Sequence, residues 1–257
     1  MHYILMDCRD FAMDSRIKLQ PLVRLGNMLT VGFEALYGKN EFAKYPSASY
    51  ILKNVMKKCG NKNYFQLFIN LAVSDVTSKD FVDIFLQAMD DAEVDGSSIV
   101  LELSECTHPD LLSNAKESLS VLRNNRVKIA LDDFGSAYSN LHFMHELPLD
   151  IVKIDKKFVQ SAPCSKKTRA MLKFCIELSH DIGCSVVAEG IETTEQLECV
   201  KELKADIGQG FLFDTSSIKA TKDFSTPFIT ICEFIEFVSG YRPLQIMNCL
   251  SAGNLKG

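Results

Sequence analysis

A chain of 257 residues, 47% of them hydrophobic, can bury a substantial core as one large domain or two small ones. Its formal net charge of −5 argues against a general nucleic-acid binder, which normally carries a basic face, so we expect no DNA partner. Its 9 cysteines form no Cys-x-x-Cys pair, which is typical of a reduced, cytoplasmic protein, and no apolar stretch approaches the roughly 18 residues of a membrane span.

The first predicted elements are two strands, over residues 17–24 and 28–37, joined by a Gly26-Asn27 turn that is typical of a hairpin. Strand-like runs then alternate with helical stretches. The further strands are predicted near 65–71, 98–103, 127–132, 150–154, 184–188 and 206–212. The helices are predicted near 47–58, 79–91, 109–124, 166–181, 193–203 and 228–240, before an irregular tail over 241–257.

These strands are rich in Val, Ile, Leu and Phe, and most are apolar on both faces, which indicates a parallel sheet covered by helices. Eight strands in about 200 residues favour a closed barrel over an open doubly wound sheet. No glycine-rich phosphate loop follows the first strand, which weakens a dinucleotide-binding reading. We therefore predict one α/β domain over 1–257, with a core over about 17–240. Its fold is a variant TIM (β/α)8 barrel in which the opening hairpin makes one strand antiparallel.

Carboxylate and amide side chains directly follow the most apolar strands. A water-soluble protein has little reason to place such groups at the ends of buried strands unless they bind a cation or take part in a reaction. In such a barrel the C-terminal ends of the strands meet at one mouth, where the chemistry takes place. The residues at or near these ends are Glu34, Asn70, Glu102, Asp132, Lys153, Glu189 and Gln209. Carboxylates gathered there without cations would repel one another and raise each other's pKa, a conflict that divalent metals remove.

The candidate ligands offer only oxygen atoms, which favours Mg²⁺ or Mn²⁺ over zinc. The adjacent acids Asp132 and Asp133 suit a two-metal site. One carboxylate would bridge two ions about 3.5–4 Å apart, while its neighbour, beyond the end of the strand, turns onto the second ion. Lys153 and Asp155 are two apart on a predicted strand and so share a face, from which the lysine can position water and offset phosphate charge.

Each of these features has an ordinary explanation when it is taken alone. A lysine at a strand end is usually a solvated charge, and Asp-Asp before Phe-Gly is often a turn. His142 and His145 have the spacing of a metal pair, yet they lie in a predicted helix with apolar neighbours and are interpreted as structural. The functional prediction depends on the residues occurring together and in order.

In that order the motifs resemble those of the EAL-domain cyclic-di-GMP phosphodiesterases of bacteria, over about residues 17–240. The motifs are Gln20-Pro21-Leu22-Val23, Glu34-Ala35-Leu36, Asn70-Leu71, Glu102-Leu103-Ser104-Glu105, Asp132-Asp133-Phe134-Gly135, Lys153-Ile154-Asp155, Ala188-Glu189-Gly190-Ile191-Glu192 and Gln209-Gly210-Phe211. The resemblance implies hydrolysis of one phosphodiester bond of cyclic di-GMP to give linear pGpG, which lowers the level of this second messenger.

The resemblance also implies a role for each site residue. Two Mg²⁺ or Mn²⁺ ions would be held by Glu34, Asn70, Glu102, Asp132, Asp133 and Glu189. Lys153 would contact the catalytic water, with Glu34 and Glu189 as the other catalytic groups. Gln20, Leu36, Asp155, Glu192 and Gln209 would lie in or near the nucleotide pocket. Glu105 would hold the loop over 134–140, which in this family links metal binding to the interface of a homodimer.

One departure from the family concerns the phosphate contact. The family usually has an arginine two residues after Glu-Ala-Leu, and this chain has Gly38 there. Losing a charged hydrogen bond of this kind costs about 1.5–3 kcal/mol, or about 10- to 150-fold in binding. Two alternatives therefore stand beside an active enzyme. One is a catalytically weak or inactive EAL protein that binds cyclic di-GMP or a regulatory protein partner, and the other is a metal-dependent barrel enzyme acting on another phosphodiester.

Overall fold

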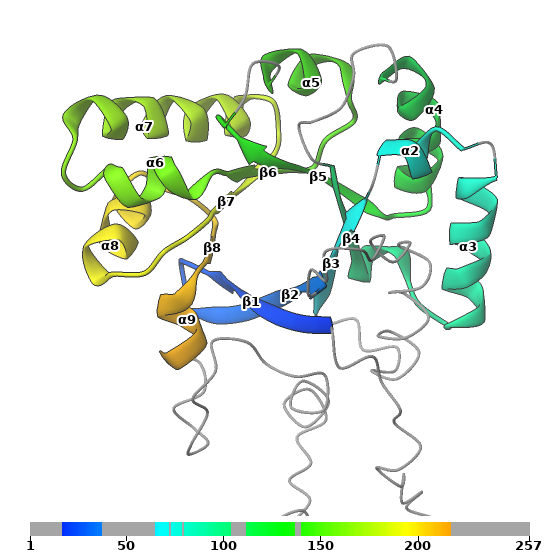
Figure 1. The fold of residues 1–257 in the computed structure, drawn as a ribbon, viewed down its shortest axis with the longest axis horizontal. Helices are drawn as coiled ribbons and strands as arrows, with labels where there is room; N and C mark the ends of the chain where they lie inside the picture. The colour runs from blue at the N-terminus through cyan, green and yellow to red at the C-terminus, as the bar shows by residue number, and fades with distance from the viewer. Residues whose placement is uncertain are drawn as a thin grey trace, which may run out of the picture.

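The computed structural model describes residues 17–37, 65–71, 73–78, 80–103, 112–136 and 140–216. Within them, eight strands close into a barrel in the order of the sequence (Figure 1). The strands are β1 Ile17–Arg24, β2 Leu29–Tyr37, β3 Gln66–Leu71, β4 Ile99–Leu103, β5 Lys128–Phe134, β6 Ile151–Ile154, β7 Ser185–Ala188 and β8 Ile207–Gln209. Each agrees with a predicted strand to within a few residues. The predicted helices over 47–58 and 228–240 and the tail over 241–257 lie outside the described residues.

The pairing of the strands confirms a TIM-type barrel with one antiparallel strand. β1 runs antiparallel to both of its neighbours, β2 and β8, while every other neighbouring pair is parallel. The reversal follows from the hairpin between β1 and β2, where Met28 adopts a φ of 58° and the Asn27 side chain accepts a hydrogen bond of 3.2 Å from the Leu29 amide. A tight turn of this kind forces its two strands to be antiparallel.

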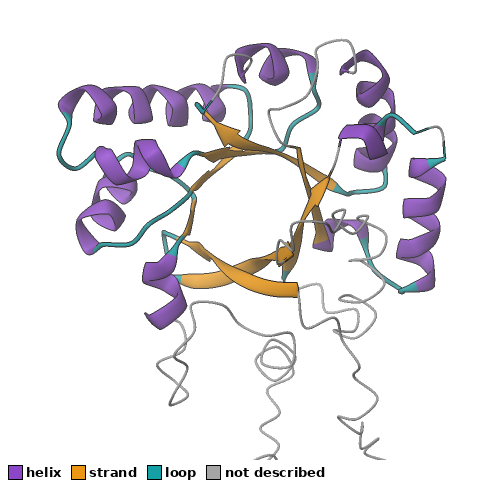
Figure 2. Cartoon of the chain, viewed as in Figure 1, coloured by secondary structure: helices purple, strands orange, loops and turns teal. Residues whose placement is uncertain are grey.

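Helices lie outside the ring of strands (Figure 2). They are α2 Val73–Val76, α3 Phe81–Asp91, η2 Gly96–Ser98, α4 Leu112–Asn124, α5 Asn140–Glu146, α6 Lys156–Ser161, α7 Lys166–Asp181, α8 Thr194–Glu202 and α9 Phe211–Ser216. The bounds of α7 match the prediction, and α8 begins with a complete capping box between Thr193 and Gln196. The sequence patterns predict neither α2 nor α6, because four and six residues are too few to show a helical period. Within the described residues, no helix has the length and apolar character needed to cross a membrane.

The predicted strand over 206–212 is wrong in its second half. β8 ends at Gln209 and α9 begins at Phe211. Gly210 makes the turn between them with a φ of 152°, and a Cβ atom there would lie 2.3 Å from the amide nitrogen of Ile191. Phe213 is buried while Phe211 is half exposed, so the apolar run packs one side of a helical turn. An apolar run this short does not distinguish a strand from a helix.

The barrel interior is apolar on one level and polar on the next. The apolar level is formed by Leu22, Phe68, Val100, Ala130, Ile151, Val187 and Ile207. Successive side chains on a strand point to opposite faces, so a residue two positions along shares the same face. On β3 to β8, the residue two positions after each member of this apolar floor is a predicted site residue. The floor fills the barrel below, and the polar side chains occupy the level above it.

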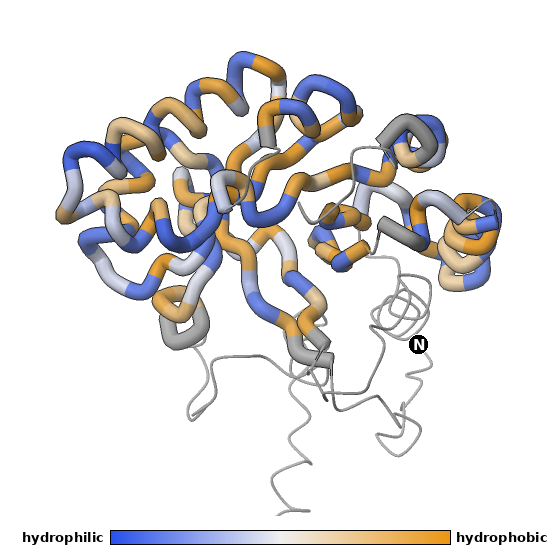
Figure 3. Tube along the Cα trace, turned by 45° about the horizontal axis from the view of Figure 1, so that its top comes forward, coloured by the Kyte–Doolittle hydropathy of each residue, from blue (hydrophilic) through white to orange (hydrophobic). Residues whose placement is uncertain are grey.

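A second, larger apolar cluster lies between the barrel and its helices, and includes Phe85 of α3, Leu119 of α4 and Ile176 of α7. Hydrophobic and hydrophilic residues alternate along these outer helices, whereas the strands are mostly hydrophobic (Figure 3). One face of each helix is therefore available to pack against the sheet, as expected for amphipathic helices that cover a buried barrel.

Candidate active site

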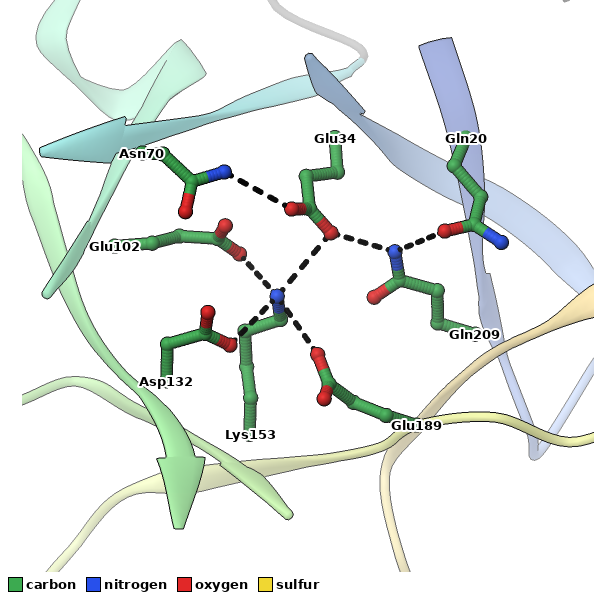
Figure 4. A network of polar contacts seen from close by, with 8 residues as sticks. All are labelled: Gln20, Glu34, Asn70, Glu102, Asp132, Lys153, Glu189 and Gln209. Atoms are coloured by element: carbon green, nitrogen blue, oxygen red, sulfur yellow. Dashed lines mark hydrogen bonds and ion pairs between the residues drawn. The ribbon is translucent and has the colours of Figure 1, made fainter. Parts of the chain in front are cut away.

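Eight polar side chains from all eight strands, or from the residue directly after a strand, converge on one point inside the barrel (Figure 4). They are Gln20, Glu34, Asn70, Glu102, Asp132, Lys153, Glu189 and Gln209. The structure thus brings together the seven residues predicted at strand ends and adds Gln20, which lies opposite Glu34 in the β1–β2 register.

Lys153 lies at the centre of this group. Its Nζ atom is 2.8 Å from Glu102 Oε1, 2.8 Å from Glu189 Oε1, 3.0 Å from Asp132 Oδ1 and 3.2 Å from Glu34 Oε2. Its side chain is only 1% exposed. An ammonium group has three N–H donors, so it cannot donate to all four carboxylates at once. It also cannot neutralise four negative charges, and the site retains a strong excess of negative charge whenever they are all ionised.

The pKa values of the buried groups follow from this excess. Burial opposes the charge of Lys153, yet the carboxylates of Glu102 and Glu189 and the other acids raise the pKa of its ammonium well above the usual value. Burial and the neighbouring charge of Glu34 raise the pKa of Glu102 well above its usual value. Burial also raises the pKa of Glu189 to about 7. Without a further cation, Glu102 and Glu189 therefore tend to retain their protons.

Glu34 differs from Glu102 and Glu189 in the direction of its pKa shift. Burial by itself would raise its pKa, but the Lys153 ammonium and the hydrogen bonds from two amides lower it. Gln209 Nε2 donates to Glu34 Oε2 at 2.6 Å, and Asn70 Nδ2 donates to Glu34 Oε1 at 3.1 Å. Hydrogen bonds of this kind favour the charged form of a carboxyl group. Glu34 is thus held ionised and in one orientation.

Asp132 and Asp133 reach the same point by a local irregularity of β5. Adjacent residues on a regular strand point to opposite faces. Here Asp133 has a φ of 55°, and the register between β5 and β6 shifts between Leu131 and Phe134. As a result, oxygen atoms of Asp132, Asp133 and Glu189 lie within 4.8 Å of one another. The prediction that Asp133 turns inward beyond the end of its strand is corrected, because β5 continues to Phe134 and the turn is a bulge within it.

The prediction that Asp155 shares a strand with Lys153 is wrong, because β6 ends at Ile154. Asp155 is instead the N-cap of α6, where its Oδ1 atom accepts a hydrogen bond of 2.7 Å from the Lys157 amide. It is buried, and its charge contributes, after burial and Asp132, to a raised pKa of Asp133. Asp155 therefore still lies near the acidic cluster, although a different element holds it there.

The remaining predicted pocket residues, Leu36 and Glu192, are more exposed than Glu34 and Gln209. Leu36 is half-buried on β2, two positions beyond Glu34 and so on the same face. Glu192 is exposed after β7, where Gln160 Nε2 donates to its Oε1 atom at 3.1 Å. Gln160 also donates to the Gly190 carbonyl oxygen, at 3.4 Å. The sequence patterns do not single out Gln160, because it lies on the short helix α6, which they do not predict. Glu105 and Gly38 lie outside the described residues.

Comparisons with known proteins agree on one family. The family model described as the EAL domain matches residues 47–216, more than half of the chain. A probable cyclic di-GMP phosphodiesterase of Escherichia coli, PdeG, is 34% identical over 149 residues, which are 58% of this chain and 29% of that protein. The cyclic di-GMP phosphodiesterase NbdA of Pseudomonas aeruginosa is 30% identical over 188 residues, 70% of this chain and 22% of that protein. The chain spans less than a third of the length of these relatives.

Solved structures show the same fold. The EAL domain of Mycobacterium smegmatis DcpA matches with a TM-score of 0.72 and 23% identity, over 87% of this chain and 95% of that chain. A standalone EAL protein from Vibrio cholerae, solved with cyclic di-GMP bound, matches with a TM-score of 0.66 and 22% identity, over 78% of this chain and 91% of that chain. At 22–23% identity, the likeness to these structures shows the fold alone.

Proposed function

Because the chain belongs to the EAL domain family, we propose that it is a metal-dependent phosphodiesterase that hydrolyses cyclic di-GMP to linear pGpG. The single observation that carries the proposal is the cluster of four carboxylates within 3.2 Å of Lys153 Nζ, at the C-terminal ends of the barrel strands. The names of the relatives in Escherichia coli and Pseudomonas aeruginosa support the choice of substrate.

The donor set fits divalent cations such as Mg²⁺ or Mn²⁺, two per site. Within the described residues, the buried oxygen Glu102 Oε2 has no hydrogen-bond donor, and Glu102 Oε1 and Asp132 Oδ1 meet only the lysine charge. Leaving such atoms without a partner is costly unless another group binds them. The carboxylates outnumber the single ammonium, and all the candidate ligands are hard oxygen donors.

The residues that would hold these ions are Glu34, Asn70, Glu102, Asp132, Asp133 and Glu189. When bound, the ions would supply positive charge that activates water and stabilises the phosphate oxygens. Asp132, Asp133 and Glu189 are close enough together to share one site, and Asn70 reaches Glu34 from the neighbouring strand. Glu34 is already ionised and fixed by two amides, so it needs little reorganisation to act as a ligand.

Lys153 would act on the nucleotide and on water. Its raised pKa keeps it fully charged at neutral pH, so it can donate a hydrogen bond to the attacking water or to an anionic phosphate oxygen. In the hydrolysis, water adds to phosphorus and the bond from phosphorus to the 3′ oxygen breaks. One proton from the water is released, and the leaving oxygen takes up a proton to become the 3′ hydroxyl of pGpG. Gln20, Leu36, Asp155, Glu192 and Gln209 would lie in or near the nucleotide pocket.

The test is incubation of the purified protein with cyclic di-GMP and either Mg²⁺ or Mn²⁺, followed by chromatographic separation of the products. We expect pGpG to appear with the metal and to be absent when the metal is removed with a chelator. If no pGpG forms at high enzyme concentration with either metal, the proposal fails.

Two variants make this test specific to the site. Glu34→Gln keeps the shape of the side chain but removes the charge, and we expect it to abolish turnover. Glu117→Gln makes the same chemical change on an exposed residue of α4, and turnover should match that of the unmodified protein. Loss of activity in both variants, or in neither, would show that the assignment of Glu34 is wrong.

A second candidate function is favoured by Gly38, which replaces the arginine usual in the family. In this alternative the protein binds cyclic di-GMP or a regulatory protein partner without turning the nucleotide over. Equilibrium dialysis with cyclic di-GMP in the presence of Ca²⁺ or a chelator would detect such binding. Saturable binding without any pGpG, under conditions where a related enzyme is active, would favour this candidate.

The homodimer remains a prediction, since Glu105 and residues 137–139 of the loop that it would hold lie outside the described residues. Sedimentation velocity of the purified chain would show its oligomeric state. The single domain over residues 1–257 and the cytoplasmic location likewise remain predictions. Limited proteolysis would test the first, because a single domain with a core over about 17–240 should give one stable fragment of that size.

A further inference from the structure

Gln20, Gln209 and Glu34 form a hydrogen-bonded chain across three neighbouring strands (Figure 4). Gln209 Nε2 donates to Glu34 Oε2 at 2.6 Å and to Gln20 Oε1 at 2.8 Å. Gln209 is 4% exposed and Glu34 is 6% exposed, so both lie away from bulk water. The chain joins residues up to 189 positions apart in the sequence.

This hydrogen-bonded group of three side chains lies where the backbone pairing between β1 and β8 stops. The last paired residues are Leu22 of β1 and Gln209 of β8. Gln20 is two positions beyond Leu22 and points to the same face. The hydrogen bond between Gln20 and Gln209 therefore joins β1 and β8 beyond the point where their backbone hydrogen bonds end. We call this β1–β8 boundary the seam. This seam is one of the two places where the barrel pairs strands in antiparallel fashion.

The orientation of the Gln209 amide is set by its two neighbours. An ionised Glu34 only accepts hydrogen bonds, so the NH₂ group of Gln209 must face it. The second N–H of that group then needs an acceptor, and Gln20 Oε1 is the one it has. The carbonyl oxygen of Gln209 must consequently face away from both. That oxygen is buried and has no donor within the described residues, and in Figure 4 it lies on the side of Lys153 and Glu189.

We propose that Gln20 is a positioning residue that acts through Gln209 on Glu34, rather than a contact to the nucleotide. By accepting one N–H of Gln209, Gln20 holds that amide with its other N–H on the Glu34 carboxylate and its oxygen aimed into the site. Without Gln20, one N–H of Gln209 is buried without an acceptor, and the amide can turn away from Glu34 to satisfy it. Glu34 then loses its shortest hydrogen bond and its fixed orientation toward a divalent cation. The proposal rests on the proposed function in that it takes Glu34 to be a metal ligand.

The test is a double-mutant cycle on Mn²⁺ affinity, measured without nucleotide by electron paramagnetic resonance of free Mn²⁺ over the metal-stripped protein. Gln20→Met removes the acceptor at nearly constant volume and should weaken Mn²⁺ binding about 10-fold or more, as is typical for residues that orient metal ligands. Gln209→Met should weaken it at least as much. In the Gln209→Met background, Gln20→Met should have no further effect, because the two changes break one chain.

Kinetics separate this role from a contact to the nucleotide. If Gln20 acts through Gln209, Gln20→Met lowers kcat at saturating Mn²⁺ and leaves the KM for cyclic di-GMP within about twofold. Gln20→Glu retains an acceptor for the Gln209 N–H and should recover most of the kcat lost in Gln20→Met. A raised KM with unchanged kcat and unchanged Mn²⁺ affinity overturns the proposal, and so do additive effects in the cycle.

A readout that needs neither metal nor substrate keeps the proposal testable if the proposed function fails. The side-chain amide protons of Gln209, assigned by their loss in Gln209→Met, should exchange slowly with solvent and should shift and exchange faster in Gln20→Met. Unchanged amide signals in Gln20→Met overturn the proposal. An unmodified protein that binds Mn²⁺ and shows the cycle but forms no pGpG contradicts the proposed function alone. Thermal melting identifies any variant that has failed to fold. If Gln20→Met does not fold, the proposal is tested by the kcat of Gln20→Glu and by the exchange rate of the Gln209 amide protons in the unmodified protein.

Discussion

Glu189 shows how much a single side chain depends on its neighbours in this site. Burial raises its pKa from the usual 4.5 to about 7 in the absence of metal. A carboxyl group with a raised pKa holds its proton more tightly in the folded protein than in the unfolded chain. Its contribution to stability is therefore fully present below about pH 4.5 and is lost as the pH rises through about 7. The pKa of Glu102 shifts in the same direction, mainly through burial.

We accordingly expect the free energy of unfolding of the metal-free protein to fall between about pH 5 and 8, by an amount on the order of 2 kcal/mol. Urea denaturation in the presence of a chelator would measure this fall. Glu189→Gln should flatten the curve, because the group no longer titrates, and excess Mn²⁺ should reverse the trend. An identical pH slope in the unmodified protein and in Glu189→Gln would contradict the expectation.

The resemblance described in the sequence analysis predicts an arginine at the position of Gly38, where it would contact a phosphate of the substrate. Restoring a guanidinium group with Gly38→Arg should lower the KM for cyclic di-GMP, by up to the roughly 10- to 150-fold that one charged hydrogen bond provides. Steady-state kinetics with Mn²⁺ would measure it, with Gly38→Gln as a control of similar length without the charge. An unchanged KM would show that another cation already contacts the phosphate.

At the scale of elements, short caps and turns bring several functional residues into place. Asp155 ends β6 and begins α6 by accepting a hydrogen bond from the Lys157 amide. Gly210 makes the sharp turn by which β8 ends directly after Gln209. The β5 bulge turns Asp133 to the side of Asp132. In each case a cap, a turn or a bulge of a few residues interrupts a regular element next to a polar site residue.

Removing the α6 cap should destabilise the protein by about 1 kcal/mol, the typical cost of replacing an aspartate cap with alanine. The change is Asp155→Ala, and urea denaturation would measure it. Asp155→Asn retains an oxygen that can accept from the Lys157 amide, so it should lose much less stability. If the two variants are equally destabilised, the charge of Asp155 and not its capping bond is what matters.

At the scale of the whole molecule, the apolar floor and the polar mouth depend on each other. The floor residues pack inside the closed barrel and exclude water beneath Lys153, which strengthens every charge interaction above them. Phe68 is fully buried in this floor, two positions before Asn70 on the same strand. Damage to the floor should therefore lower both stability and metal affinity.

Phe68→Ala should lower the free energy of unfolding by about 3–5 kcal/mol, the usual cost of truncating a buried phenylalanine. Phe174→Ala on α7 is a matched control, since that ring is 59% exposed, and it should change stability by no more than about 0.5 kcal/mol. Chemical denaturation of both variants would check this. A small loss for Phe68→Ala would mean that the floor is less tightly packed than its burial indicates.

The sequence by itself determined the class of fold and the candidate residues, because both follow from patterns among residues that are close together in the sequence. Apolar strands that alternate with amphipathic helices predicted the barrel, and the bounds of α7 and the capping box of α8 followed from residues close in the chain. The resemblance to a known family added the roles that such patterns cannot assign.

Only the tertiary structure decided which of these residues meet. The contact between Lys153 and Glu34 spans 119 positions and that between Gln209 and Glu34 spans 175, so no local pattern contains them. The structure also places Asp155 in a helix cap rather than a strand, and it ends β8 at Gln209, because the turn at Gly210 packs closely against Ile191. Closing the barrel is what turns separate strand ends into one site, since only closure sets the distances on which charge, pKa and metal binding depend.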